Sequence, residues 1–214
     1  MNSSPDPLVS TIASYEAGAA SYASRSRDRS PLSHLHDRFA SFLGSRALVL
    51  DVGCGAAHDA AELAERGLSV VACDPTRGLL RQAGAHPIVA STLVCGDARN
   101  PPFASESFSG IWACASLLHL PKSQISRALT ETRRVLKPNG LLFTSMQRGE
   151  TDGFVPVGER DSLPGRFYVY YMEIEWRTLI ESAGFEIIDQ RVGSSMQGLN
   201  AGATGWIETF GRRA

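Results

Sequence analysis

Short continuous runs of apolar residues alternate along the chain with segments in which apolar residues recur every three or four positions. The first pattern predicts buried strands and the second predicts amphipathic helices. The expected strands are residues 48–51, 69–74, 92–95, 108–114, 141–146, 185–191 and 205–212. The helices expected between them are residues 57–66, 77–83, 123–136 and 173–183.

This alternation indicates an α/β fold in which helices cover both faces of a parallel sheet. The last two strands are joined by residues 192–204 without a crossover helix, so they are expected to pair antiparallel. We therefore predict a doubly wound, mostly parallel sheet of seven strands with an antiparallel last strand.

Two further helices are expected before the first strand, over residues 8–25 and 32–43. Ser30 and Pro31 are typical of a helix start, as N-cap and first helical residue. Residues 147–172 are rich in Gly and Pro and end in aromatic residues, which predicts a long irregular connection of the kind that is often functional.

Composition and charge exclude only a few classes of protein. The 214 residues carry a net charge of −1, which gives no general affinity for nucleic acid or membrane. The cluster Arg25, Arg27, Arg29 and Arg38 is expected to be a solvated face. No run approaches the roughly 18 apolar residues of a membrane span, and residues 1–10 lack the pattern of a signal peptide, so we expect a cytoplasmic protein. The four cysteines form no Cys-x-x-Cys pair, so no metal is expected.

The most informative stretch lies between the first strand and the next helix. The strand ends at Asp51, and Gly53 and Gly55 follow in a short loop. Glycines let the backbone turn sharply and leave no Cβ in the way of a ligand. The helix that follows directs free N–H groups at the loop, which suits a ligand with a carboxylate or phosphate.

Polar residues also follow the other strands of the expected sheet, at the edge where open parallel sheets bind ligands. Asp74 ends the second strand and can accept both hydroxyls of a ribose, although it could instead cap the next helix. Asp97 follows the third strand and can accept a hydrogen bond from an adenine amine, while the Ala98 N–H meets a ring nitrogen. Residues 115–119 follow the fourth strand, and together these positions predict a crevice for a nucleoside-bearing ligand.

Taken together, these segments resemble the class I S-adenosylmethionine-dependent methyltransferases, whose fold is Rossmann-like. The matching segments are 49–55 (VLDVGCG), 71–74 (VACD), 95–98 (CGDA), 116–120 (SLLHL) and 134–140 (RVLKPNG). Two positions depart from the family pattern. Ala57 stands where the family often has glycine, and Asn139 stands in a Pro-Gly-Gly position, where asparagine can adopt a left-handed turn.

The resemblance implies S-adenosylmethionine as cofactor, with S-adenosylhomocysteine as product. It places the methionine part near Gly53 and Gly55, the ribose at Asp74 and the adenine at Asp97 and Ala98. Further cofactor contacts are implied at Asp51, Cys54, Pro75, Ala115 and Ser116. The first helix resembles the lid of small family members, in which a tyrosine at the position of Tyr22 closes over the cofactor.

The resemblance also implies how the chain divides. We expect one methyltransferase domain over residues 1–214, with N-terminal lid helices in 1–45 and a cofactor-binding core in 46–147. An acceptor-side insertion is expected in 148–172, and a C-terminal helix and strand pair in 173–214. The sequence leaves a monomer and a homodimer equally open.

A small-molecule acceptor is the expected substrate. His119 is the candidate base if the acceptor must lose a proton, its alternative being a structural histidine; Tyr22 is a second candidate catalytic residue. Tyr168, Tyr170 and Tyr171 are expected to line the acceptor pocket, or else to pack in the core. The alternatives are a tRNA wobble-uridine carboxyl methyltransferase, an NAD-dependent dehydrogenase and a binding protein that has lost catalysis. Neutral charge disfavours the first, and the missing third glycine, at His58, disfavours the second.

Overall fold

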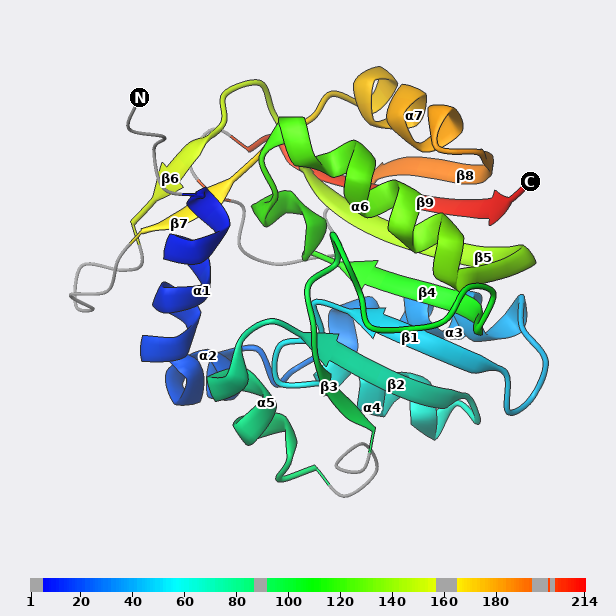
Figure 1. Cartoon of the computed structure of the whole chain (residues 1–214), viewed down its shortest axis with the longest axis horizontal. Coiled ribbons are helices and arrows are strands. Elements are labelled where there is room, and N and C mark those ends of the chain that lie inside the picture. Colours follow the sequence, from blue (N-terminus) through cyan, green and yellow to red (C-terminus); the bar gives the residue numbers. More distant parts are fainter. Residues whose placement is uncertain (1–5, 87–91, 157–164, 194–199, 201–202) are drawn as a thin grey trace.

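A seven-stranded sheet in the order β3-β2-β1-β4-β5-β9-β8 forms the centre of the molecule (Figure 1). The computed structural model describes residues 6–86, 92–156, 165–193, 200 and 203–214. The strands of this sheet are β1 (Leu48–Val52), β2 (Ser69–Asp74), β3 (Leu93–Cys95), β4 (Phe108–Cys114), β5 (Leu136–Arg148), β8 (Phe185–Gly193) and β9 (Gly205–Arg213). Strands β1 to β5 pair in parallel, whereas β9 is antiparallel to both β5 and β8. The predicted α/β fold is confirmed.

Helices cover both faces of the sheet, and two N-terminal helices lie beside the ends of its strands (Figure 1). The helices are α1 (Pro7–Ala17), α2 (Ala19–Arg25), α3 (Ser33–Ser41), α4 (His58–Glu65), α5 (Arg77–Ala83), α6 (Lys122–Val135) and α7 (Glu173–Ser182), with short 3₁₀ turns η1 (Ser30–Leu32) and η2 (Leu117–His119). Figure 1 shows α6 and α7 in front of the sheet and α3 and α4 behind it. Within the described part of the chain, no helix has the length and apolarity to cross a membrane.

Successive residues of each central strand point to opposite faces, which builds two hydrophobic cores. Leu50, Ile111 and Leu142 pack in the core beneath α6 and α7. Their sequence neighbours Val49, Trp112 and Phe143 pack in the core beneath α3 and α4. Because both faces are buried, these strands are continuous apolar runs, and this is why the sequence pattern located them.

The N-terminal segment differs from its prediction in two places. The expected helix over 8–25 is two helices, α1 and α2, because Gly18 both ends the first and caps the second. The expected helix over 32–43 begins with the turn η1, so the N-cap of α3 is Leu32 and not Ser30.

The connection after β5 is more regular than predicted. It contains β6 (Gly153–Val155) and β7 (Arg166–Tyr168), which form a separate antiparallel pair. Phe154 and Phe167 lie opposite each other with ring centroids 5.4 Å apart, and such cross-strand aromatic pairs stabilise a two-stranded sheet. The interpretation of this segment as irregular was therefore wrong. Residues 157–164 of the segment lie outside the described part of the chain.

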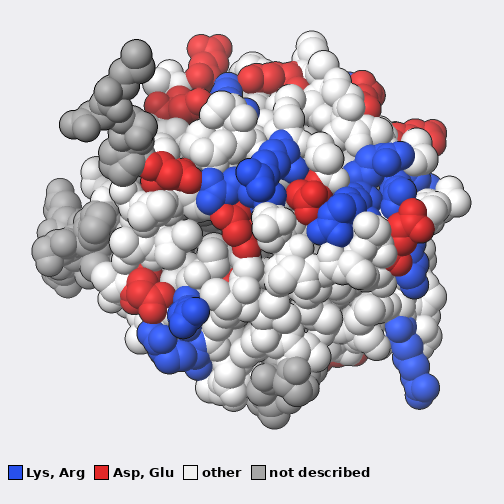
Figure 2. Space-filling model, viewed as in Figure 1, with Lys and Arg blue, Asp and Glu red and all other residues white. Residues whose placement is uncertain are grey.

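Lys and Arg side chains are conspicuous on the face that carries α6, with Asp and Glu interspersed among them (Figure 2). Arg134 pairs with Glu131 on this helix, and Arg213 pairs with Glu106 beside it. Arg99, also on this face, pairs with Asp97. The cations described here therefore have acidic neighbours, and this face carries mixed charge.

Candidate cofactor and acceptor site

The loop between β1 and α4 adopts a conformation that its glycines make possible. Gly53 has φ +71° and Gly55 has φ +56°. A Cβ atom at Gly53 would lie 2.3 Å from the Cβ of Ser116, so the loop also approaches the segment after β4 too closely for any side chain. Ala57, where glycine was the more usual residue, has φ 59° and caps α4 in the left-handed conformation. Asn139 has φ 60°, which confirms its predicted left-handed turn.

Asp51 lies beneath this loop with an exposed fraction of only 2%. Burial, together with the neighbouring Asp59 carboxylate, raises the pKa of Asp51 well above its usual range. Its Oδ2 atom has no hydrogen-bond partner among the described residues, and neither has the Oγ atom of Ser116. Two unpaired polar atoms beside a tight glycine loop fit a ligand that brings its own donors, such as the amino-acid part of a nucleoside cofactor.

Asp74 connects the end of β2 to the glycine loop. Its carboxylate accepts hydrogen bonds from the backbone N–H of Gly55 at 2.9 Å and of Thr76 at 2.7 Å. Burial raises the pKa of Asp74, and these two hydrogen bonds partly offset that rise. The Thr76 side chain also hydrogen-bonds this carboxylate, while the Oδ2 atom, which accepts from Gly55, keeps a second lone pair with which to accept from a hydroxyl. Thr76, not Asp74, is the N-cap residue of α5.

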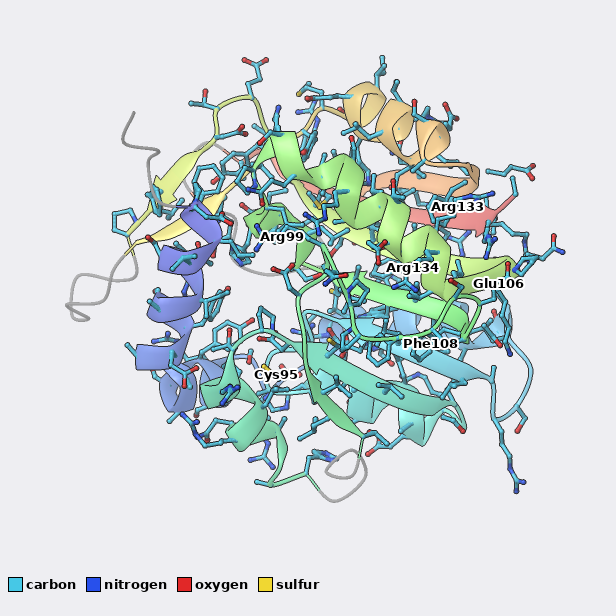
Figure 3. All side chains as sticks on the ribbon, in the orientation of Figure 1. Cys95, Arg99, Glu106, Phe108, Arg133 and Arg134 are labelled. Atoms are coloured by element: carbon cyan, nitrogen blue, oxygen red, sulfur yellow. The ribbon has the colours of Figure 1, made fainter. Side chains whose placement is uncertain are left out.

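Asp97 is engaged with Arg99 rather than open to a ligand. Its carboxylate accepts from the Nε of Arg99 at 2.9 and 3.0 Å, and from the backbone N–H of the same residue at 2.8 Å. Arg99 also pairs with Asp6, the N-cap of α1, and contacts Gln124 of α6. Figure 3 shows Arg99 between these two helices. Neither Asp97 nor Ala98 borders the cavities described next, so the adenine contacts stay a prediction.

Two cavities meet at the glycine loop. The smaller has a volume of about 80 Å³ and is the part of the predicted cofactor crevice bordered by Gly53, Gly55, Asp74, Pro75, Ala115, Ser116 and His119. The larger, of about 390 Å³, is called the acceptor-side cavity here. Its walls include Tyr15, Tyr22, Arg29, Cys54, Gln147, Arg166, Tyr168 and Trp206. Tyr15 and Tyr22 of the N-terminal helices border both cavities.

Tyr22 lies over the glycine loop, as expected of a lid residue. Its Cε1 atom is 3.4 Å from the position that a Cβ on Gly55 would take, and its ring meets that of Tyr15 edge to face at 5.0 Å. Burial raises the pKa of Tyr22 to about 12. The hydroxyl is therefore protonated at neutral pH and can donate a hydrogen bond, but it is a poor base.

His119 is held at both ring nitrogens. Its Nδ1 lies 2.7 Å from the carbonyl oxygen of Phe167, which can only accept, so Nδ1 carries the proton. Its Nε2 lies 2.9 Å from the hydroxyl of Tyr15 and therefore accepts from it. Burial lowers the pKa of His119 to about 4. His119 is thus neutral at pH 7, and its basic nitrogen is occupied by a hydrogen bond from the lid.

The three predicted acceptor-side tyrosines have different positions. Tyr168 borders the acceptor-side cavity, and its ring centroid is 4.6 Å from that of His119. Tyr170 and Tyr171 do not border either cavity and are buried. Tyr171 packs against Trp176 of α7, because β7 ends at Tyr168 and the chain then turns into the core. Their positions match the alternative that the sequence left open, packing in the core.

Two arginines of the acceptor-side cavity were not recognised as site residues from sequence. Arg29 was assigned to a solvated face, yet its guanidinium pairs with buried Asp59, which also accepts from His36 at 2.8 Å. Arg166 is 6% exposed and borders the same cavity. In the sequence, the only nearby indication of the Arg29–Asp59 pair was that Asp59 stands in the first turn of α4. No neighbouring residue in the sequence indicated that Arg166 is buried.

The fold and these residues define a class of protein: a doubly wound α/β cofactor-binding domain with an antiparallel strand next to the edge of its sheet and a helical lid over the glycine loop. Residues 49–140 match the family described as a methyltransferase domain. Methyltransferase GfsG from Streptomyces halstedii is 39% identical over 160 residues, which are 66% of this chain and 53% of that protein. Demethylmenaquinone methyltransferase from Thermobifida fusca is 35% identical over 128 residues, covering 56% and 53%.

A solved structure has the same fold over the full chain. It is the 1,6-didemethyltoxoflavin-N1-methyltransferase of Burkholderia thailandensis, with its substrate and S-adenosylhomocysteine bound. The TM-score is 0.74 at 17% identity, and the match covers 100% of this chain and 92% of that one. The chain therefore contains a methyltransferase domain over residues 49–140 with the fold of S-adenosylmethionine-dependent methyltransferases, a family whose cofactor is S-adenosylmethionine. This assignment decides against the dehydrogenase interpretation.

The chain spans about half the length of each of the two curated relatives named above. Ser116, with its unpaired Oγ atom, and the tight turn at Gly53 would suit the methionine part of the cofactor, and the Oδ2 atom of Asp74 would suit its ribose. When bound, the cofactor supplies a methyl group already activated on a sulfonium. What the chain itself must do is orient an acceptor and exclude water.

Proposed function

We propose that this chain transfers a methyl group to a small-molecule acceptor held in the acceptor-side cavity. The observation that carries the proposal is the position of this cavity. It shares Gly53, Tyr15 and Tyr22 with the smaller cofactor crevice, but extends away from Asp74 toward Tyr168 and Trp206. A ligand there would lie next to the methionine end of a cofactor whose ribose is at Asp74, and holding acceptor and methyl group in line supplies much of the rate.

The dimensions and walls of this cavity support a metabolite-sized acceptor. A volume of about 390 Å³ is within the usual range of pockets for small molecules. Tyrosine and tryptophan rings offer flat apolar surface with polar tips, which suits a partly apolar or aromatic compound. Tyr15 and Tyr22 of the N-terminal helices form part of its wall.

Two of the named relatives support the same conclusion by what they act on. Their names give demethylmenaquinone as the acceptor of one and 1,6-didemethyltoxoflavin as that of the other. Both acceptors are small molecules and not nucleic acids. We take from them the class of acceptor and not the particular molecule, since the identity to the second is only 17%.

Transfer to tRNA is the second candidate, based on the resemblance of residues 166–168 to the wobble-uridine carboxyl methyltransferases. Such binding requires many Lys and Arg contacts to phosphate. The net charge of −1 and the acidic neighbours of the arginines around α6 speak against it.

The test has a binding step and a transfer step. Calorimetry should show binding of S-adenosylhomocysteine and none of NAD, and Asp74→Asn should weaken that binding by about 1–3 kcal/mol. Radiolabelled S-adenosylmethionine should then label a compound in a small-molecule extract. Bulk tRNA at low and at moderate salt should remain unlabelled. Label found only in tRNA would overturn the small-molecule proposal and leave the methyltransferase assignment standing.

A further inference from the structure

Arg166 is a buried cation with a hydrogen-bonding edge that no group of the described residues uses. It lies on β7, is 6% exposed and borders the acceptor-side cavity. Its Nε lies 3.4 Å from the Oγ of Ser14, a long hydrogen bond. Its buried Nη2 has no hydrogen-bond partner among the described residues. A guanidinium is always charged and has five N–H donors, so a buried edge without an acceptor is costly.

The surroundings hold this guanidinium in place but do not neutralise it. It lies 3.7 Å from the ring centroid of Tyr15 and 5.4 Å from that of Tyr22, both on the lid. Aromatic faces attract a cation, which compensates part of the cost of burial. They accept no in-plane hydrogen bonds, however, so the Nη2 atom stays unpaired among the described residues.

Arg29, in the wall of the same cavity, differs from Arg166 because its charge is paired with a carboxylate. Its Nε is 2.7 Å from a carboxylate oxygen of Asp59, and its Nη2 pairs with the other oxygen. Burial acts to lower the pKa of Arg29, but the Asp59 charge outweighs it and raises that pKa. Arg29 is therefore compensated within the protein. The charge of Arg166 has no such partner among the described residues, which points to an anion supplied from outside.

We propose that Arg166 binds a carboxylate of the acceptor, so that the substrates of this enzyme are small carboxylic acids. The inference rests on the proposed function and adds the chemical class of its substrate. A carboxylate matches the planar fork of a guanidinium with two parallel hydrogen bonds, and burial strengthens such a pair. Because Tyr15 and Tyr22 belong to the lid, a bound carboxylate would also attach the acceptor to the closed lid.

The methionine carboxylate of the cofactor is the competing anion. Arg166 borders the acceptor-side cavity, together with Gln147 and Tyr168, and does not border the smaller crevice that contains Asp74 and Ser116. Gly53 and Cys54 of the glycine loop also border the acceptor-side cavity, so the cavity walls alone do not separate the two anions. Arg166 comes from the segment after β5, next to Tyr168, and this position favours the acceptor. The experiment below separates the two anions directly.

The test uses simple carboxylates as probes on the full chain saturated with S-adenosylhomocysteine. Benzoate, salicylate and hexanoate are compared with their amides by ligand-observed NMR. At least one acid should bind, and its amide should bind at least about tenfold more weakly. Arg166→Met should weaken the acid at least about tenfold, and Arg166→Lys should have an intermediate effect. Arg177→Met, on the exposed face of α7, removes the same charge elsewhere and should change nothing.

The affinity of each variant for S-adenosylhomocysteine and for methylthioadenosine, which lacks the carboxylate, serves as the control. If Arg166→Met weakens S-adenosylhomocysteine alone, the arginine belongs to the cofactor and the inference fails, while the proposed function stands. Unchanged binding of the acids in this variant, or no binding of any acid to the wild type, also overturns it. A wild type that does not bind S-adenosylhomocysteine would instead refute the proposed function. The comparison of acid with amide on the wild type does not depend on the folding of any variant.

Discussion

The Nε2 atom of His119 accepts a hydrogen bond from the hydroxyl of Tyr15 over 2.9 Å, and this bond joins the lid to the segment that follows β4. Two further contacts attach α1 to other segments at this edge of the sheet. Glu16 accepts from the backbone N–H of Gly78 at 2.7 Å, in helix α5 after β2, and Asp6 pairs with Arg99, after β3. The lid is therefore connected to three segments that follow strands at the edge where the cofactor is expected to lie.

The first prediction concerns pH. Burial lowers the pKa of His119 from 6.5 to about 4, so the unfolded chain binds a proton at a higher pH than the folded chain does. The free energy of unfolding is therefore unaffected by the titration of His119 above pH 6.5, and it decreases as the pH falls from 6.5 toward 4. We expect a loss of roughly 2 kcal/mol between pH 7 and pH 5. Urea unfolding at both pH values should show a larger loss for the wild type than for His119→Gln, since only the wild type has a histidine at position 119. Equal pH dependence of the two proteins would contradict the prediction.

The second prediction concerns Gly53. An alanine there must adopt φ +71° and also place its Cβ 2.3 Å from that of Ser116. Gly67 is the matched control, because it has φ +84° but open space around its Cβ position. We expect Gly67→Ala to cost about 1–2 kcal/mol for the left-handed conformation alone. Gly53→Ala should cost about 1–3 kcal/mol more and abolish cofactor binding. If Gly53→Ala and Gly67→Ala lower the free energy of unfolding equally, the close approach of Gly53 to Ser116 adds no cost and the prediction is wrong.

The third prediction concerns the pair between Arg29 and Asp59. Burial opposes the charge of Asp59, but Arg29 and a hydrogen bond from His36 hold the pKa of Asp59 well below its usual range. Asp59→Ala leaves a largely buried guanidinium without a partner and should destabilise the fold by about 3–5 kcal/mol. Asp37→Ala is the control: this residue pairs with Arg66 at 2.7 Å, but its side chain is 66% exposed, so the loss should be below about 1 kcal/mol. Thermal and urea unfolding would measure both. A loss from Asp59→Ala as small as that from Asp37→Ala would refute the prediction.

The sequence predicts well those features that depend on a single short segment of the chain. The bounds of β2, β4 and α5 agree with the prediction because each is a continuous apolar run or a short helix with clear ends. The pair of β6 and β7 was missed because Phe154 meets Phe167 only in three dimensions. The same reason applies to the site. The glycine loop and Asp74 follow from local pattern, whereas the burial of Arg166 depends on a lid that is far away in the sequence.

The last prediction concerns the lid itself. The central sheet begins at Leu48, and of the described residues 6–28 the two hydrophobic cores include only Leu8 and Ile12. A chain that lacks residues 1–28 should therefore fold. It should bind S-adenosylhomocysteine at least about tenfold more weakly, because it lacks Tyr15 and Tyr22, which border the cofactor crevice, and the contacts of α1 to the segments after β2, β3 and β4. Circular dichroism would establish that the truncated chain is folded, and calorimetry would measure the affinity. Arg99→Met in the full chain breaks a single one of these contacts and should produce a smaller loss. If the truncated chain is folded and binds the cofactor as tightly as the full chain does, α1 and α2 are not a lid.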